Sequence, residues 1–410
     1  MGKKVGIMTF HRAPNYGAVL QTYALQTAIQ NEGYDVEVID YIPQIAADAS
    51  AKGIPLNTVV DFDRVKSSKV LVNYAPIGIK KRIKRFLIEL RDYKLRNIKK
   101  REIEFALRRN KDFHEFLKKH LVISKDQCIG TEKLSDFMKN YDSVITGSDQ
   151  VWNGTFILSD LAYLLPGGKG VNKIAYAAST GAGHFEDFGV NDRAKQALRE
   201  LAYISVRENT SKEAVEAFCD LDKSIEITLD PTLLLSRLSY EKVANESSFD
   251  KPFIFLYTVK PKADALANAA KSLAERTGLP ILALMSAAPK RAWDALIAKV
   301  APGDTSPSGF LALIRDAEYI VTDSFHGTVF SLHFNKKFFF ITGKTDEAKP
   351  AADGRMANLC DLFNIQDRLC SAQSMDSVSL ESEPDWALFE TRRKDEAEKS
   401  LDFLRTALKG

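Results

Sequence analysis

The chain has 410 residues, of which 45% are hydrophobic and 27% charged, and its formal net charge is +3. This length favours two domains over a single core, and the composition is typical of globular proteins and excludes extensive disorder. Because no apolar run approaches the roughly 20 residues of a membrane helix, and because no signal peptide is visible at the start, we expect a cytoplasmic protein.

Known catalytic and metal-binding motifs are missing from the sequence. The four cysteines, at positions 128, 219, 360 and 370, are scattered without C-x-x-C pairing, which indicates reduced structural thiols. There is no Walker loop, G-x-G-x-x-G, H-E-x-x-H or G-x-S-x-G. Two D-x-D pairs, at 61–63 and 220–222, do not follow clear strands, and we interpret them as chance matches. We therefore expect no metal and no cofactor, and nothing in the sequence points to a nucleic-acid partner.

The segment from residue 64 to residue 119 is strongly basic, with 19 Lys and Arg against 6 Asp and Glu. Its apolar residues recur at helical spacing, so we predict a helical insertion. Two interpretations stay open. The insertion rests on an anionic membrane surface at the inner face, or its apolar stripe packs on the first domain and its lysines are solvated.

The first half of the chain alternates strands and helices. Residues 5–10 are predicted to form a buried strand, followed by a loop over 11–17, a helix that ends near Gly33 and a second strand over 35–40. Further strands are predicted at 143–146, 174–178, 203–206 and 226–229. This alternation is typical of a doubly wound parallel sheet.

A polar linker over residues 245–252 precedes a second series of the same kind. Its strands are predicted at 253–257, 280–285, 319–322 and 337–342, and its helices at 263–276, 310–315 and 327–334. We therefore predict an α/β fold of two doubly wound, Rossmann-like domains facing a cleft, similar to B-type glycosyltransferases. The domains span 1–245 and 246–385, and a final helix within 386–410 packs back on the first domain.

Parallel α/β sheets bind ligands beyond the carboxyl ends of their strands, so the strand-end loops are the candidate site. The first such loop contains Asn15, Tyr16 and Gly17, where a helix begins whose free backbone N–H groups can hold an anion. The alternative is that Asn15 is an ordinary helix cap and Gly17 a close-packing residue.

The second loop follows the strand over 143–146 and is crowded with polar groups. It holds Ser148, Asp149, Gln150, Trp152 and Asn153. Carboxylate and amide groups beside an indole suit a sugar, whose hydroxyls need hydrogen-bond partners and whose apolar face needs a ring. The alternative is a helix cap through Ser148 or Asp149.

The third loop contains Ser324, His326 and Gly327, directly after the strand over 319–322. A histidine at a helix start can act as acid or base near neutral pH, while the helix N-terminus holds phosphate. A lone histidine is more often structural, and His333, further along the same helix, is interpreted as a core or interface residue.

Two arginines are candidate anion-binding groups. Arg207 follows the strand over 203–206 and can fork onto a carboxylate or phosphate, or pair with its neighbour Glu208. Arg355 follows a short polar turn. The turn at Asp230 is a similar strand end with a weaker claim.

These segments together, in this order, resemble the polysaccharide pyruvyl transferase family. The motifs are T-F-H-R-A-P-N-Y-G-A-V-L-Q at 9–21, G-S-D-Q-V-W-N at 147–153, Y-A-A-S at 176–179, S-V-R-E at 205–208, D-P-T-L-L-L at 230–235 and D-S-F-H-G-T-V-F-S at 323–331. The resemblance covers about residues 4–342. In one departure, Thr180 stands before Gly181, where an aromatic residue is common.

The resemblance implies transfer of the pyruvyl group of phosphoenolpyruvate onto two hydroxyls of a sugar. The product is a cyclic ketal, phosphate is released, and the acceptor is a glycan or lipid-linked sugar of a capsule or other exopolysaccharide. It assigns His326 as the acid and Asp149 as the base, with Arg207, Ser324, Gly327 and Arg355 on the donor side. Asn15, Tyr16, Gly17, Ser148, Gln150, Trp152 and Asn153 are assigned to the acceptor side. The alternatives are a nucleotide-sugar glycosyltransferase of the same fold and a non-catalytic glycan-binding protein.

Overall fold

The structure is a computed structural model of the whole chain. It describes residues 3–44, 47, 108–153, 161–181, 191–246, 249, 251–259, 264–285, 299–300, 305–342 and 354–410. Most of the predicted basic insertion lies outside the described residues. Its last part, residues 108–119, lies within a helix over residues 108–120.

The first half of the chain builds a parallel sheet. Its described strands are β1 (Lys4–Met8), β2 (Asp35–Ile42), β3 (Ile123–Ile129), β4 (Ser143–Gly147), β5 (Asn172–Ala178), β6 (Tyr203–Val206) and β7 (Ile225–Ile227). They are arranged in the order β3-β2-β1-β4-β5-β6-β7, with parallel pairing throughout. The helices are α1 (Tyr16–Asn31), α7 (Thr131–Met138), α9 (Asn191–Glu200) and α10 (Asn209–Phe218), with a short helix η2 (Leu161–Leu164). The strand order changes direction between β1 and β4, as it does in a doubly wound fold.

The second half repeats this design. Its described strands are β8 (Ile254–Thr258), β9 (Ile281–Met285), β10 (Lys299–Val300), β11 (Tyr319–Thr322), β12 (Lys337–Ile341) and β13 (Leu369–Cys370), in the parallel order β10-β9-β8-β11-β12-β13. Its helices are α12 (Asp264–Thr277), α14 (Pro307–Asp316), α15 (Phe325–His333) and α16 (Gly354–Phe363), with short helices η5 (Gln366–Arg368) and η6 (Gln373–Asp376). The prediction of two doubly wound sheets is confirmed, and the domain boundary near residue 245 stays a prediction.

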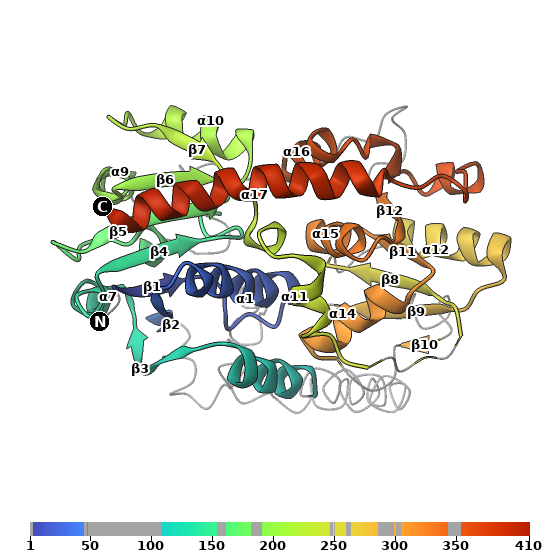
Figure 1. Cartoon of the computed structure of the whole chain (residues 1–410), viewed down its shortest axis with the longest axis horizontal. Coiled ribbons are helices and arrows are strands. Elements are labelled where there is room, and N and C mark those ends of the chain that lie inside the picture. Colours follow the sequence, from blue (N-terminus) through green and yellow to red (C-terminus); the bar gives the residue numbers. More distant parts are fainter. Residues whose placement is uncertain are drawn as a thin grey trace, which may run out of the picture.

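The two sheets lie side by side along the long axis, with α1, α14 and α15 between them (Figure 1). The short helices η4 (Pro231–Leu233) and α11 (Arg237–Glu241) follow the last strand of the first sheet. Helix α17 (Trp386–Lys409) runs across both halves (Figure 1). None of the described helices has the length and apolarity that crossing a bilayer requires.

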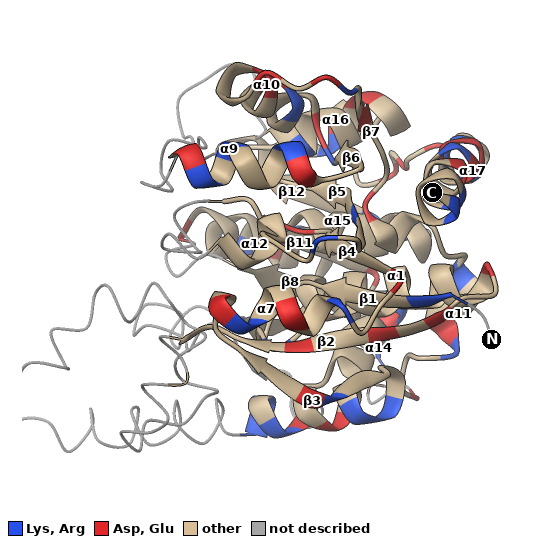
Figure 2. Cartoon of the chain, turned by 90° about the vertical axis from the view of Figure 1, so that its left-hand side faces the viewer, with Lys and Arg blue, Asp and Glu red and all other residues tan. Residues whose placement is uncertain are grey.

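Buried polar contacts hold α17 against the first half. The Arg393 guanidinium donates to the carbonyl oxygens of Leu233 and Leu235 at 3.1 and 3.2 Å. Near the other end, the Asn172 amide of β5 donates to the Ala407 carbonyl at 2.7 Å. Figure 2 shows that acidic and basic residues mix on α17 and on other outer helices, while the central strands carry few charges. Charged residues therefore cover the outside of the two sheets.

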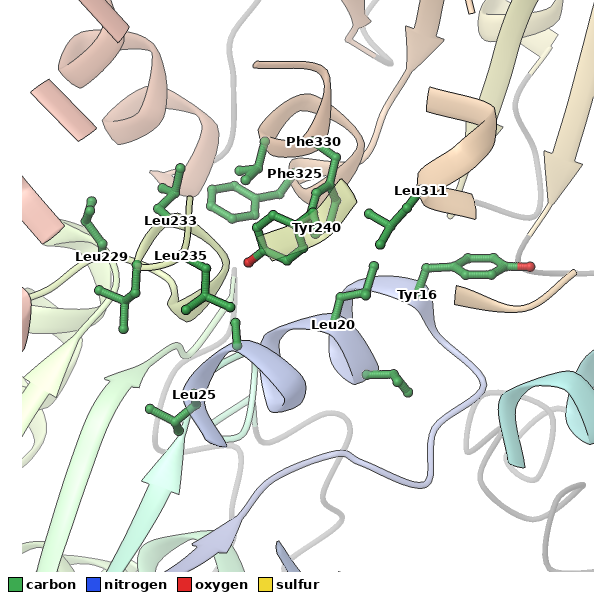
Figure 3. Packing of buried hydrophobic residues seen from close by; sticks show 14 of the residues in the cluster. Tyr16, Leu20, Leu25, Leu229, Leu233, Leu235, Tyr240, Leu311, Phe325 and Phe330 are labelled. Carbon is green, nitrogen blue, oxygen red and sulfur yellow. The ribbon is translucent and has the colours of Figure 1, made fainter. Parts of the chain in front are cut away.

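One apolar cluster extends through both halves (Figure 3). Tyr16 of α1 stacks on Phe310 of α14, with ring centroids 4.7 Å apart and planes 15° apart, and its hydroxyl donates to the Thr305 carbonyl at 2.9 Å. Tyr240 of α11 meets Phe330 of α15 edge to face at 5.0 Å. Each large side chain buried in this way contributes about 1.5–3 kcal/mol. The two halves are therefore joined by core-like packing, which holds strand-end loops from both sheets together.

Candidate active site

The Asp230 carboxylate lies where the two halves meet and is almost fully buried. Its Oδ1 accepts from the Thr232 backbone N–H at 3.0 Å and the Thr232 hydroxyl at 2.6 Å. Its Oδ2 accepts from Arg207 Nη1 at 2.7 Å and Ser148 Oγ at 3.1 Å. The Nε2 of His326, from the second half, stands 3.6 Å from the same Oδ2, beyond hydrogen-bond distance.

Burial by itself would raise the pKa of Asp230, but His326, Arg207 and Thr232 together hold it well below its usual range. The carboxyl group is therefore ionised at neutral pH and serves as a fixed negative charge. Since both of its oxygens are already engaged, it is suited to holding neighbouring side chains in place.

Arg207, at the carboxyl end of β6, is buried between two carboxylates. Besides Asp230 it approaches Glu208 Oε2, 3.4 Å from its Nε, and its guanidinium carbon lies 4.8 Å from the centroid of the Phe325 ring. Burial lowers the pKa of Arg207, while Asp230, Glu208 and Asp149 raise it, and the net shift is upward. Its Nη2 is buried and has no hydrogen-bond partner among the described residues. A buried, unpaired guanidinium N–H is a free donor for a ligand.

Glu208 connects this arginine to the loop after β5. Its carboxylate is fully buried and accepts from the Ser179 hydroxyl at 2.6 Å and from the Ser211 hydroxyl. Ser211 Oγ in turn accepts from the backbone N–H of Thr180 at 2.9 Å. Thr180, the residue that departs from the family pattern, is itself buried in this network. Thr180 therefore places a hydrogen-bonding side chain in the interior of this loop, with its hydroxyl 3.1 Å from Ser211 Oγ.

His326 is the second residue of α15, which begins at Phe325 and not at residue 327 as predicted. Ser324 caps the helix by accepting from the Gly327 N–H at 3.3 Å. A Cβ on Gly327 would lie 2.6 Å from Thr322 Oγ1, so this glycine allows the helix to start close against β11. The Nε2 of His326 is buried and has no hydrogen-bond partner among the described residues, although Asp230 Oδ2 lies 3.6 Å away.

The ring of His326 lies against the start of α1. A Cβ on Gly17 would overlap the imidazole, with Cε1 only 2.6 Å away. The Asn15 side chain caps α1 by accepting from the Ala18 N–H at 3.2 Å. The N-terminal ends of α1 and α15 thus meet beside Asp230, and both helix dipoles favour negative charge there. Gly17, predicted on the acceptor side, instead gives space to the candidate acid.

The first two motifs also support Asp230 through hydrogen bonds. The Gln21 side chain accepts from the Ser148 N–H at 3.1 Å and donates to Thr9 Oγ1 at 2.8 Å. Ser148 is fully buried, and its hydroxyl contacts the Ala177 carbonyl at 3.0 Å in addition to Asp230. This corrects the acceptor-binding role predicted for Ser148, because its side chain is committed to the interior.

Two predicted acceptor-side aromatics are also corrected. Trp152 is fully buried, and its indole N–H donates to the Tyr163 carbonyl at 3.0 Å, so it offers no face to a sugar. Tyr16 is fully buried in the contact between the halves described above. Both residues are therefore packing residues next to the site.

Asp149, Gln150 and Asn153 remain candidate acceptor residues. Asp149 has a φ of 69°, a left-handed conformation that few non-glycine residues adopt, and its carboxylate accepts from the Gln150 N–H at 2.9 Å. Asn153 donates to Gln150 Oε1 at 2.8 Å, and a Cβ on Gly181 would lie 2.7 Å from Asn153 Nδ2. The Asp149 charge also contributes to the raised pKa of Arg207.

Arg355 lies at the start of α16. Its neighbour Gly354 faces Thr210 of α10, since a Cβ on Gly354 would lie 2.9 Å from Thr210 Cγ2. Thr210 is two residues beyond Glu208 in sequence, so α16 approaches the loop after β6. The predicted role of Arg355 as a second anion clamp stays a prediction.

The predicted residues Arg207 and His326 are thus brought together, and sequence reasoning left Asp230, the group between them, outside the site. In the sequence, Asp230 is marked as a polar residue that follows β7 and directly precedes Pro231, the first residue of the short helix η4. Two buried nitrogens without hydrogen-bond partners within the described ranges, one from each of the two side chains that flank Asp230, lie beside two helix N-termini. Such an arrangement can bind an anion and exchange a proton with it. Among the described residues, no group of three His, Cys, Asp or Glu side chains is placed to hold a metal ion.

The family model described as polysaccharide pyruvyl transferase matches residues 15–345. No curated protein sequence matches the chain.

Among solved structures, a UDP-N-acetylglucosamine 2-epimerase from Listeria monocytogenes is 10% identical over 97% of this chain and 91% of that chain, with a TM-score of 0.51. The corresponding epimerase from Neisseria meningitidis is 11% identical over 99% of both chains, with a TM-score of 0.45. MurG from Acinetobacter baumannii is 13% identical over 98% of this chain and 99% of that chain, with a TM-score of 0.42. At such identities the likeness to the Listeria protein shows the fold alone, two Rossmann-like domains.

Proposed function

The chain belongs to the polysaccharide pyruvyl transferase family, and from this premise we propose that it transfers the pyruvyl group of phosphoenolpyruvate onto two hydroxyls of a sugar. The product is a cyclic ketal, and inorganic phosphate is released. The acceptor is a glycan or a lipid-linked sugar in the synthesis of a surface polysaccharide such as a capsule.

The observation that carries the proposal is the meeting of Arg207 and His326 at Asp230. Phosphoenolpyruvate has a carboxylate and a phosphate, so its site needs buried donors and positive charge. Arg207 Nη2 and His326 Nε2 are buried nitrogens with no hydrogen-bond partner among the described residues. Asp230 Oδ2 lies 2.7 Å from the other terminal nitrogen of Arg207, Nη1, and 3.6 Å from His326 Nε2. Two helix N-termini add partial positive charge. In the proposal Arg207 holds one of the donor's anionic groups, and Ser324 and Gly327 shape the helix start that holds the other.

Proton transfer to the donor's methylene carbon begins the proposed reaction. His326 gives a proton to this carbon, which becomes a methyl group, and the central carbon becomes an oxocarbenium-like electrophile. A sugar hydroxyl attacks that carbon and loses its proton. The bond between the central carbon and the phosphate oxygen then breaks, and the second hydroxyl adds to close the ketal. Of the two hydroxyl protons, one restores His326 and the other leaves with phosphate.

The acceptor side of the proposal uses the half-buried loop after β4. Asp149 removes the proton from the attacking hydroxyl and passes it to the departing phosphate, while the proton of the second hydroxyl restores His326. Gln150 and Asn153 orient the sugar, and Asn15, at the start of α1, is also assigned to the acceptor side. This chemistry uses no metal ion and no cofactor. Peripheral attachment to the inner face of an anionic membrane, through the basic segment over residues 64–119, stays a prediction that falls mostly outside the described residues.

A phosphate-release assay tests the proposal. The purified chain is incubated with phosphoenolpyruvate and a panel of β-galactosides and N-acetylhexosamines. We expect phosphate release that depends on one acceptor, together with a ketal on that acceptor seen by mass spectrometry. A thermal shift with UDP or GDP but none with phosphoenolpyruvate would instead support a nucleotide-sugar glycosyltransferase. Glycan binding without phosphate release would support a non-catalytic binding protein.

A further inference from the structure

A second polar cluster lies beyond the carboxyl end of β1 and on the neighbouring strands β2 and β3. Its centre is the carboxylate of Asp40 in β2. Asp40 Oδ1 accepts from His11 Nε2 at 3.2 Å and from Arg12 Nε at 2.6 Å. Asp40 Oδ2 accepts from Arg12 Nη2 at 2.6 Å and from Gln127 Nε2 at 3.0 Å. No step of the proposed reaction uses these four residues.

Asp40 is itself unsuited to catalysis. It is buried, and its two oxygens accept four hydrogen bonds, about as many as a carboxylate can take. Burial by itself would raise its pKa, but His11, Arg12 and Gln127 hold the pKa well below its usual range. Asp40 therefore acts as an anchor that holds Arg12 in one orientation through a two-point contact.

His11 contacts the same carboxylate from the interior. His11 is buried, its Nδ1 lies 3.2 Å from the Thr9 carbonyl, and its Nε2 lies 3.2 Å from Asp40. The position of the Asp40 carboxylate, and with it the orientation of Arg12, is therefore fixed from several sides.

Part of the Arg12 guanidinium group is exposed and is not bonded to Asp40. Its side chain is 33% exposed, and Asp40 occupies only Nε and one N–H of Nη2. The remaining N–H groups of the guanidinium have no partner in the described part of the chain. Arg12 and Gly17 belong to the same loop and helix start, and five residues span at most about 18 Å. The backbone of Arg12 therefore lies at most about 18 Å from that of Gly17, which contacts His326.

We propose that Arg12, oriented by Asp40, binds an oxyanion carried by the acceptor, a phosphate or a carboxylate attached near the sugar that is modified. A fixed guanidinium edge suits such a group because it offers paired N–H donors to two oxygens. The identification of the ligand as the acceptor rests on the proposed function. Binding of an oxyanion by Arg12 does not depend on it. Arg12 is in this view a specificity-determining residue, and the nitrogens around Asp230 bind the donor.

Titration calorimetry with inorganic diphosphate and, separately, with glucuronate tests this site. Arg12→Gln should weaken binding of at least one probe about 10-fold or more, since a charge-assisted hydrogen bond is lost. Arg237→Gln is the matched control, because Arg237 is also a half-exposed arginine paired with a carboxylate, Glu241, at 2.7 Å. It should bind both probes like the unchanged chain. Preference for one probe identifies the oxyanion as phosphate or carboxylate.

Further variants separate this proposal from the proposed function. Arg207→Gln should still bind the probe, diphosphate or glucuronate, whose binding Arg12→Gln weakens. This result is expected whether or not the chain turns over phosphoenolpyruvate. Arg12→Lys keeps a charge at the site but not the two-point contact with Asp40, and should bind more weakly than the unchanged chain. It also serves if Arg12→Gln does not fold by circular dichroism. Binding of neither probe by the unchanged chain, or equal binding by the folded Arg12 variants, would overturn the proposal.

Discussion

The imidazole of His326 fills the space that a side chain on Gly17 would need. These two residues belong to helices of different halves, α1 and α15, and are 309 positions apart in the sequence, yet a Cβ on Gly17 would lie 2.6 Å from His326 Cε1. The first helix of one half therefore forms part of the surface that orients the candidate acid of the other half.

Gly17→Ala should displace His326 and lower turnover strongly, because a methyl group cannot share the space of the ring. We expect a loss approaching the 10²–10⁴-fold that removal of a general acid causes, with native circular dichroism. Phosphate release measures it. In the His326→Ala background the same substitution should cost little more, since both act on one group. An equal additional loss in that background would contradict the coupling.

His326→Ala should nearly abolish phosphate release while the fold survives. The lost general acid costs about 10²–10⁴ in rate. His114→Ala, at an exposed position of the helix over residues 108–120, is the control and should keep full turnover. If a folded His326→Ala protein releases phosphate at the native rate, His326 is not part of the mechanism.

Arg207→Lys should weaken phosphoenolpyruvate binding although the charge is kept. Lysine cannot reach Asp230 and also offer a second donor in the fixed geometry of a guanidinium. We expect about 10- to 150-fold lower affinity by calorimetry, corresponding to one charge-assisted hydrogen bond. Arg207→Ala should in addition lower the melting temperature, because Asp230 and Glu208 would be left buried without a cation. Native donor affinity in Arg207→Lys would make this arginine a structural residue.

Asp149→Asn should lower turnover and spare donor affinity. In the proposal Asp149 takes a proton from the sugar hydroxyl, and an amide cannot do so. Steady-state kinetics with phosphoenolpyruvate, combined with calorimetry of donor binding, separate the two effects. Asp149 also contributes to the raised pKa of Arg207, so the two losses are compared with each other. Turnover should fall by a larger factor than donor affinity. A loss confined to donor binding would place Asp149 on the donor side.

His333 should make the chain less stable as the pH falls. Burial lowers the pKa of His333 to about 4, and its Nε2 donates to the Thr232 carbonyl at 2.8 Å. An unfolded histidine has a pKa near 6.5, so between about pH 6.5 and pH 4 the unfolded chain binds a proton that the native chain does not. The free energy of unfolding should therefore fall by up to about 3 kcal/mol across this window and level off below it.

Urea unfolding at a series of pH values measures the His333 effect. His333→Gln should flatten the curve in this window, because glutamine does not titrate and can still donate to Thr232. His114→Gln, at an exposed position, should leave the pH dependence as it is. A His333→Gln curve that keeps the native slope between pH 4 and 6.5 would show that other groups cause it.

Local pattern determined much of the fold and part of the site. Apolar runs of four to eight residues predicted the strands around which both sheets are built, because a strand in a parallel sheet is buried on both faces. Strand β3 was missed, since Ser124, Lys125, Asp126 and Gln127 make it read as a loop. Arg207 and His326 were found because they follow such runs, and ligands bind beyond the carboxyl ends of parallel strands.

Tertiary packing decided the rest. Trp152 read as a sugar-binding aromatic and Tyr16 as an acceptor-side residue at a helix start, and only the tertiary structure placed both in the interior with their polar atoms paired. Asp230 read as a strand-end turn with a weaker claim until its oxygens met Arg207 from β6 and Ser148 from the loop after β4. Periodicity reports on neighbours within a few residues along the chain. Burial and the partners of a charge depend on segments that meet only in the tertiary structure, so Arg207 and His326 could be named as candidates from the sequence, while the carboxylate between them had only a weaker claim.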